Sequence, residues 1–217
     1  MRPMRPRIDF IRTTVGVWLC GAATAMLGCS NRPGRVATPE IGADEASETA
    51  IRLYDSDANG QLSKAELQKC PPLLLKLQEI DADGDQLLSA NEIRQRVADW
   101  LETRVGFVTG YKCKVLENGR PLAGANVEIV PEEFLGDAIK PASGTSDSGG
   151  IASLAVAETD LPSDLHGLRG VQLGMYRVRI THPTKPVPKN YNKETMLACE
   201  IYPSGDPEMM TYDIRTK

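Results

Sequence analysis

The sequence has few histidines and lacks the short motifs of several common enzyme active sites. Only two of its 217 residues are histidines, His166 and His182, and neither lies in the HExxH pattern of zinc hydrolases. No GxSxG nucleophile motif, P-loop or GxGxxG loop occurs. We therefore predict that the protein is not an enzyme.

The chain also lacks the marks of zinc-binding and nucleic-acid-binding proteins. Its five cysteines form no CxxC pair, and with so few histidines a structural zinc site is not expected. The formal net charge is −4 and no basic face is present, so nucleic acid is not an expected partner. Aromatic residues make up 5% of the chain, but hydrophobic residues make up 41%, which is sufficient for a buried core.

Residues 1–28 have the organisation of an export signal. The positively charged start contains four arginines: Arg2, Arg5, Arg7 and Arg12. An apolar run over 14–27 follows, and it is shorter than the roughly 20 residues of a membrane-spanning helix. The run ends in Met-Leu-Gly-Cys29-Ser, which resembles a bacterial lipobox, so the resemblance implies lipidation at Cys29. An uncleaved anchor and simple secretion are the alternatives. Residues 29–43, rich in proline, glycine and polar side chains, are predicted to be a flexible tether.

The same twelve-residue pattern occurs twice between residues 55 and 92, as DSDANGQLSKAE and DADGDQLLSANE. Numbered from the first aspartate, positions 1, 3, 5, 9 and 12 carry side-chain oxygens in both copies. These residues are Asp55, Asp57, Asn59, Ser63 and Glu66 in the first loop, and Asp81, Asp83, Asp85, Ser89 and Glu92 in the second. Position 7 would add the backbone carbonyls of Gln61 and Leu87. Calcium takes six to eight oxygen ligands, and the EF-hand loop supplies them from these positions. The motif is that of the EF-hand. We predict two Ca²⁺ sites.

The residues around the loops predict a compact EF-hand pair over 44–103. Leu62 and Leu88, both at position 8, should pair the two loops through a short β-bridge. Pro71 and Pro72 should end the first exit helix near residue 69, and a second helix should start near 73. The result resembles the compact EF-hand pairs of bacterial exported proteins. A short exit helix leaves little room for sensor-type opening, which favours a structural calcium site over a calcium-responsive switch.

The two predicted calcium sites are not equivalent. The first has glycine at position 6, where the loop turns sharply, whereas the second has Gln86 there and Gly84 at position 4. A non-glycine residue with positive φ costs on the order of 1 kcal/mol. The second loop has four carboxylates against three in the first, which could offset that cost. We expect unequal affinities, without a fixed order.

From residue 104 to 217 the pattern changes to short β-rich runs with period two. The runs are 105–116, 125–130, 150–157, 175–180, 195–202 and 209–214, separated by turn signals such as Asn118-Gly119. This spacing predicts an antiparallel β-sandwich. The predicted fold is therefore multidomain, α-helical first and then all-β.

The β-rich half resembles a known family through the segment NGRPLAGANV at 118–127, with further matches at 110–115, 144–150 and 174–180. It is similar to the carboxypeptidase regulatory-like domain, a transthyretin- or immunoglobulin-like β-sandwich of exported bacterial proteins. The resemblance implies fold and export, and says little about a ligand.

Three residues outside the loops carry structural expectations. In an exported protein Cys113 and Cys199 can form a disulfide, and the alternative is two buried free thiols. Trp100, at the end of the last predicted helix, is expected to pack between the two domains rather than to stack on a sugar.

Together these features predict a calcium-binding exported lipoprotein that is a non-enzymatic structural or binding module of the cell envelope. Its expected partners are Ca²⁺, the membrane through a lipid on Cys29, and an envelope or extracellular protein. A calcium-responsive switch and an accessory subunit of an extracellular polymer-degrading enzyme are the alternatives.

Overall fold

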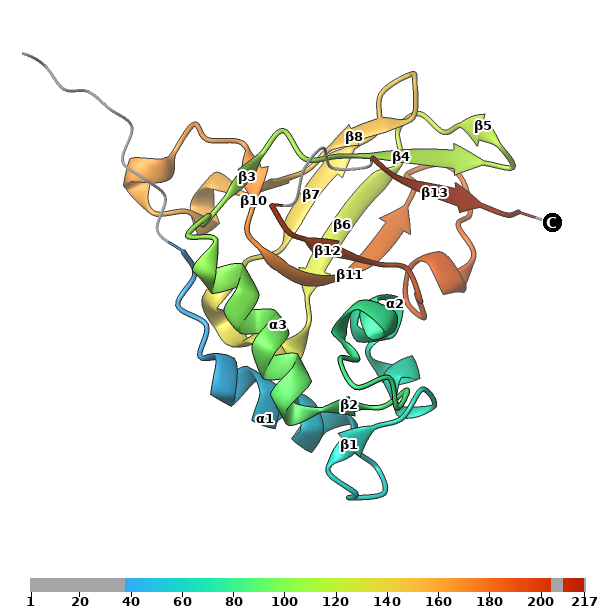
Figure 1. The fold of residues 1–217 in the computed structure, drawn as a ribbon. Coiled ribbons are helices and arrows are strands. Elements are labelled where there is room, and N and C mark those ends of the chain that lie inside the picture. The colour runs from blue at the N-terminus through green and yellow to red at the C-terminus, as the bar shows by residue number, and fades with distance from the viewer. Residues whose placement is uncertain (1–37, 204–208, 217) are drawn as a thin grey trace, which may run out of the picture. The chain divides into compact units, whose positions relative to one another are not determined.

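Helices occupy the first part of the described chain and strands most of the rest (Figure 1). The computed structural model describes residues 38–203 and 209–216, which all belong to one compact unit, Gly34–Lys217. The predicted export signal, Cys29 and the tether as far as residue 37 lie outside the described residues. Within the described residues, no helix has the length and apolarity required to cross a membrane. The fold class is mixed α plus β.

Three α-helices and one short 3₁₀ helix form the helical half. They are α1 (Ala43–Tyr54), η1 (Glu66–Lys69), α2 (Pro71–Ile80) and α3 (Ala90–Glu102). The predicted break after residue 69 is confirmed, but α2 begins two residues earlier than expected. Pro71 and Pro72 occupy its first turn, where the missing N–H groups have no intrahelical partner to lose. Ile41, inside the predicted tether, is buried in the core, so the packed chain begins before residue 44.

A two-stranded bridge joins the two predicted loops. β1 (Gln61–Leu62) pairs antiparallel with β2 (Leu88–Ser89), and Leu62 lies opposite Leu88. Both leucines are fully buried among the helices. The predicted β-bridge between the two position-8 residues is confirmed.

The strands form two main sheets. The five-stranded sheet has the order β12-β11-β6-β7-β9, and all its neighbouring strands are antiparallel. In that order the strands span Ala198–Ile201, Gly174–Thr181, Asn126–Pro131, Ala142–Thr145 and Ala155–Val156. The second sheet has the order β13-β4-β5, with β8 also pairing with β4, from Met210–Ile214, Lys112–Glu117, Arg120–Pro121 and Ile151–Ser153. A separate pair joins β3 (Val108–Thr109) to β10 (Gly170–Val171). Short 3₁₀ helices lie in the connections, at Glu133–Ala138, Glu158–Asp160, Ser163–Leu165 and Lys189–Tyr191.

Period-two alternation buries one face of each sheet in a shared core. Val127 and Ile129 of β6 and Val178 of β11 point inward from the five-stranded sheet, and Val115 of β4 and Ile214 of β13 do so from the second sheet. The same hydrophobic cluster continues into the helical half. The described helices and sheets are therefore packed through one continuous core.

Two details differ from the predicted antiparallel arrangement. β13 pairs with β4 in parallel, because the chain leaves β12 in one sheet and enters the other alongside β4 in the same direction. β7 lies outside the predicted β-rich runs, since Ala-Ser-Gly-Thr has no strong β-forming pattern. Its position is fixed by pairing with β6 and by Gly144, where a Cβ atom would overlap the carbonyl of Ser153.

Candidate metal centre

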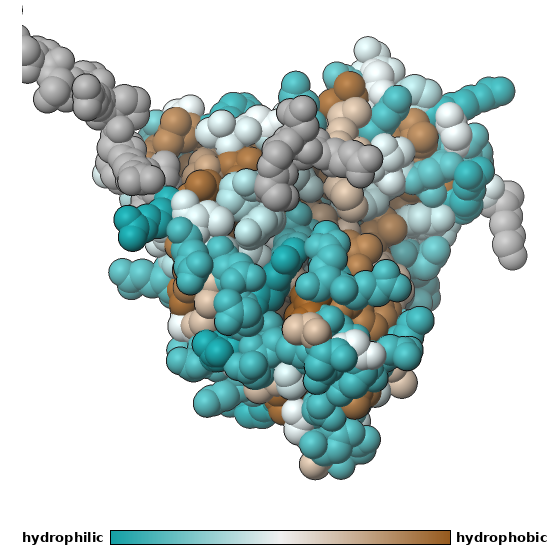
Figure 2. Space-filling view, in the orientation of Figure 1, coloured by the Kyte–Doolittle hydropathy of each residue, from teal (hydrophilic) through white to brown (hydrophobic). Residues whose placement is uncertain are grey.

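Each predicted calcium loop connects two helical elements of the structure. The first loop, Asp55–Glu66, starts directly after α1 and ends in η1, and the second, Asp81–Glu92, starts directly after α2 and ends in α3. The turn of each loop is exposed, whereas the glutamates at position 12 are buried. The face of this half that Figure 2 shows is mostly hydrophilic.

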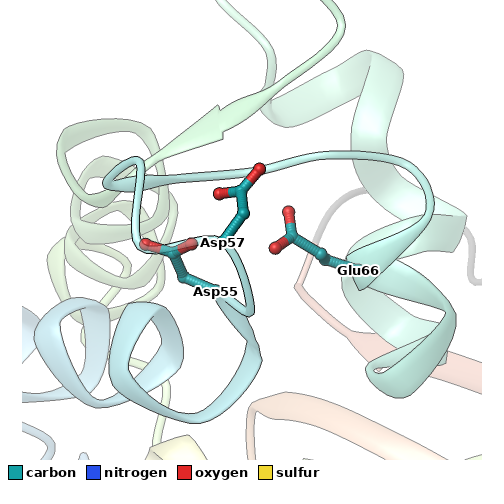
Figure 3. Close-up of side chains that lie close together, drawn as sticks. All are labelled: Asp55, Asp57 and Glu66. Carbon is teal, nitrogen blue, oxygen red and sulfur yellow. The ribbon is translucent and has the colours of Figure 1, made fainter.

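The carboxylates at the start of each loop converge. In the first loop, oxygen atoms of Asp55, Asp57 and Glu66 all lie within 4.8 Å of one another (Figure 3). In the second, the same holds for Asp81, Asp83 and Asp85. The first cluster therefore includes the glutamate that ends its loop, while the second consists of aspartates alone. Both are sets of hard oxygen donors, the type that Ca²⁺ and Mg²⁺ prefer.

The two loops share one hydrogen-bond pattern. The side chain at position 1 accepts the backbone N–H of position 6, at 2.8 Å for Gly60 to Asp55 and 2.9 Å for Gln86 to Asp81. The position 3 side chain accepts the N–H of position 5, at 3.1 and 3.2 Å. The position 5 side chain accepts the N–H of position 7, at 2.8 Å in both loops. Each loop is thus wrapped around its own acidic side chains.

The glutamate at position 12 closes each loop onto its start. Glu66 accepts the N–H of Ser56 at 2.6 Å and that of Ser63 at 2.8 Å. Glu92 repeats this with the N–H groups of Ala82 at 2.8 Å and Ser89 at 2.9 Å. The hydroxyls of both serines also donate to these glutamates, at 2.8 Å. These hydrogen bonds hold the two ends of each loop together without a bound ion.

These hydrogen bonds favour the ionised form of both glutamates. Donation from Ser63 and Ser56 lowers the pKa of Glu66 to about 2. At Glu92 burial raises the pKa, but hydrogen bonds from Ser89 and Ala82 outweigh it and the net pKa is below the usual value. Metal ligation requires the deprotonated carboxylate, so both groups are in the required state at neutral pH.

Backbone strain is shared by the loops rather than confined to the second one. Gln86 has φ 66°, as the sequence predicts for position 6. Ala58, at position 4 of the first loop, also has positive φ, at 59°, like Gly84 at the equivalent position of the second loop, at 77°. Each loop thus has one glycine and one L-residue at its two left-handed positions. The expectation that only the second loop has a non-glycine residue at positive φ is therefore wrong. The positive φ of Ala58 was missed because alanine at position 4 does not indicate a left-handed conformation.

Asn59, Gln61 and Leu87 are the remaining predicted ligands to be located in the structure. The amide oxygen of Asn59 accepts the backbone N–H of Gln61, whose own side chain donates to Asp85 of the other loop at 3.4 Å. Gln61 belongs to β1, and Leu87 directly precedes β2. The chain therefore brings positions 7 of the two loops to the same two-stranded bridge.

Cys113 and Cys199 are both buried free thiols in the core between the sheets. Burial raises the pKa of each to about 12. The hydroxyls of Tyr111 and Tyr212 lie against the Cys199 thiol. The thiols are accordingly in their neutral, unreactive form at physiological pH.

Sequence reasoning missed two buried carboxylates where the helices meet the strands. Glu132, directly after β6, is 5% exposed, and the side chain of Glu200 in β12 is 2% exposed. Glu200 follows the inward-facing Cys199 in a strand, so period-two alternation predicts that the Glu200 side chain faces solvent. Trp100, also at this junction, is buried as expected, and its indole N–H donates to Glu200 at 2.9 Å.

No protein family, curated protein or solved structure matches this chain.

Proposed function

We propose that the protein binds two Ca²⁺ ions through an EF-hand pair and is a non-enzymatic exported module of the cell envelope. The observation that supports calcium binding most directly is the shared loop geometry. Two segments 26 residues apart, counted from Asp55 to Asp81, fold their side-chain oxygens inward with the same hydrogen bonds. Random acidic surface loops have no reason to repeat such a pattern.

The donor set favours calcium over magnesium. Each loop offers carboxylates, an amide or serine oxygen and backbone carbonyls, which together can supply the six to eight oxygens of a calcium shell. Magnesium demands near-ideal octahedral geometry and usually keeps several waters. For a site outside the cell, an affinity on the order of 10⁻⁴–10⁻³ M is sufficient for occupancy.

A structural role for calcium is favoured over a switch. The first loop is followed by η1, a single turn of four residues, which cannot swing as a long exit helix does. Two helices that flank the second loop, α2 and α3, are bonded to Glu200 of the β half. Calcium would therefore order a pair that is already docked.

The β half supports the proposal that this module is a two-sheet sandwich of the carboxypeptidase regulatory-like type. Its inward faces share one core, and the turn at Asn118-Gly119 has both residues at positive φ, 52° and 80°, as a tight hairpin requires. Export and membrane attachment rest on the N-terminal sequence and on Cys29. If Cys29→Ser leaves membrane association unchanged, the proposed lipid anchor is wrong.

Calorimetric titration with Ca²⁺ tests the central proposal. The protein should bind two ions, and Asp55→Ala or Asp81→Ala should each remove one of them. Calcium should raise the melting temperature without increasing the binding of a dye specific for apolar surface. No heat and no thermal shift would refute calcium binding, whereas increased dye binding would favour the switch.

A further inference from the structure

Two carboxylates of the β half are buried beneath the helical half. Glu200 belongs to β12 and Glu132 directly follows β6, and β11 lies between these two strands of the five-stranded sheet. A buried charge is costly unless it is paired and hydrogen-bonded. The partners of these two glutamates are therefore informative, and most of them come from the helices that flank the loops.

Glu132 is linked to both flanking helices of the first loop, directly to the entering helix and through Arg177 to the exit helix. It accepts a hydrogen bond at 3.2 Å from the hydroxyl of Tyr54, the residue directly before Asp55. Arg177 of β11 donates to Glu132 at 3.2 Å and also to the backbone carbonyl of Lys69 at 2.8 Å. Lys69 is the last residue of η1, the helix that begins with Glu66. The entering and exit helices of the first loop are thus held at one point.

Glu200 contacts both flanking helices of the second loop directly. Arg96 of α3 donates its Nε to Glu200 at 2.7 Å, and the ammonium of Lys76 in α2 lies 3.8 Å away. Arg96 also pairs at 3.2 Å with Glu79, which is two residues before Asp81. The guanidinium therefore connects the entering and exit helices of the second loop to each other and to the sheet.

The periodicity of α3 links the contacts with Glu200 to Glu92, the glutamate that closes the second loop. Glu92, Arg96 and Trp100 are spaced four residues apart, so they lie along one face of α3. Glu92 closes the second loop, and the other two side chains donate to Glu200. A shift of α3 on the sheet therefore moves the closing glutamate of the loop with it.

We propose that Glu132 and Glu200 are positioning residues for calcium, each fixing the flanking helices of one loop and so setting the affinity of that loop more strongly than that of the other. This inference rests on the proposed function. A site that is pre-organised loses less freedom when the ion binds, which raises affinity without any new contact to the ion. By reciprocity, calcium in a loop strengthens the attachment of that loop to the β half.

The test uses the protein with one loop at a time. Asp81→Ala leaves the first loop able to bind, and Asp55→Ala leaves the second. In each background Ca²⁺ affinity is measured by calorimetry with Glu132→Gln or Glu200→Gln added. We expect Glu132→Gln to weaken the first loop by about fivefold or more, and Glu200→Gln to weaken the second by a similar factor. The mismatched combinations should change affinity by less than about twofold.

Matched controls separate positioning from general loss of stability. Glu128→Gln removes a half-exposed carboxylate of β6 that pairs with Arg179 at 3.9 Å, and should leave both loops unchanged. Tyr54→Phe deletes only the hydroxyl that reaches Glu132, and Arg96→Met replaces the guanidinium with an uncharged, unbranched side chain. Because these variants keep most of the side-chain volume, they serve if a glutamate variant does not fold.

Three results are distinguishable. Selective weakening of the matching loop supports the inference. Equal weakening of both loops by one substitution, or no weakening by either, overturns it while calcium binding stands. Failure of both one-loop backgrounds to bind Ca²⁺, when the two-loop protein also fails, refutes the proposed function itself.

Discussion

The two loops are built from the same hydrogen bonds but differ in charge and in the position of glycine. The first has three carboxylates and its glycine at position 6, whereas the second has four and its glycine at position 4. Each nevertheless has two residues at positive φ, one of which is not glycine. The fold of such a loop therefore tolerates an L-residue at either left-handed position. What distinguishes the sites is the charge and the source of their carboxylates.

The loops also differ in the length of the helix at their C-terminal end. The first ends in the four residues of η1, and the second in the thirteen residues of α3, which starts with a complete capping box between Ser89 and Glu92. Glu66 nevertheless makes the same contacts to Ser63. A full exit helix is therefore not required to place the closing glutamate.

The largest expected effect comes from removing that glutamate. Glu66→Gln and Glu92→Gln should each weaken calcium binding at the matching loop by at least about tenfold, or about 1.4 kcal/mol. Glu66→Gln should be the more severe, because Glu66 is one of three converging carboxylates, whereas Asp81, Asp83 and Asp85 converge without Glu92. Calorimetry in the one-loop backgrounds measures both losses. A greater loss for Glu92→Gln would reverse the comparison.

A charge exchange at position 5 should make the loops more alike. Asn59→Asp gives the first loop a fourth carboxylate and should raise its affinity several-fold, and Asp85→Asn should lower that of the second by a similar factor. Without calcium, Asn59→Asp should destabilise the protein. The Asn59 amide of the unsubstituted protein donates to Asp57 at 3.0 Å, and an aspartate in its place would repel Asp57. Urea unfolding with and without calcium measures both effects. Unchanged affinities would mean that carboxylate number does not rank the sites.

Exchanging the left-handed residues for glycine should have a smaller and equal effect in the two loops. Ala58→Gly and Gln86→Gly each remove a positive-φ penalty of about 1 kcal/mol, partly offset by the greater freedom of glycine in the unfolded chain. We expect a net gain of a few tenths of a kcal/mol in the free energy of unfolding. The reverse changes, Gly60→Ala and Gly84→Ala, should destabilise by about 1 kcal/mol. A gain in the second loop only would restore the inequality expected from sequence.

Local chemistry made much of the helical half predictable. Three features follow from residue type and spacing: the two loops between helical elements, the β-bridge between Leu62 and Leu88, and the helix break at Pro71. The structure contains all three. Positive φ at Ala58 was not predictable, because nothing in alanine signals it. The conformation is imposed by the loop as a whole.

Tertiary contacts account for the features of the β half that sequence did not predict. Alternation identified most strands but not their direction, so the parallel pairing of β13 with β4 was missed. Alternation also placed Glu200 on the face opposite Cys199 without showing that helices cover that face. Charged residues in otherwise ordinary strands become informative only when their neighbours in space are known.

Acid titration provides the finest comparison, between a loop carboxylate and a buried one at the junction. Glu66 has a folded pKa of about 2, lowered by hydrogen bonds from Ser63 and Ser56, against an ordinary value of 4.5. The unfolded chain therefore binds its proton first, so the stability from Glu66 is full above about pH 4.5 and is lost as the pH falls towards 2. Glu92, with its pKa also lowered, should act in the same sense.

Glu132 should act in the opposite sense, because burial raises its pKa above 4.5 despite the interactions with Arg177 and Tyr54 that lower it. Its contribution is present below pH 4.5 and is lost as the pH rises through its folded pKa. In calcium-free protein, Glu66→Gln should flatten the acid limb of the stability profile, and Glu132→Gln should flatten the fall above it. Thermal unfolding measured at a series of pH values tests both. If the two variants changed the same limb, the opposite directions of the pKa shifts of Glu66 and Glu132 would be wrong.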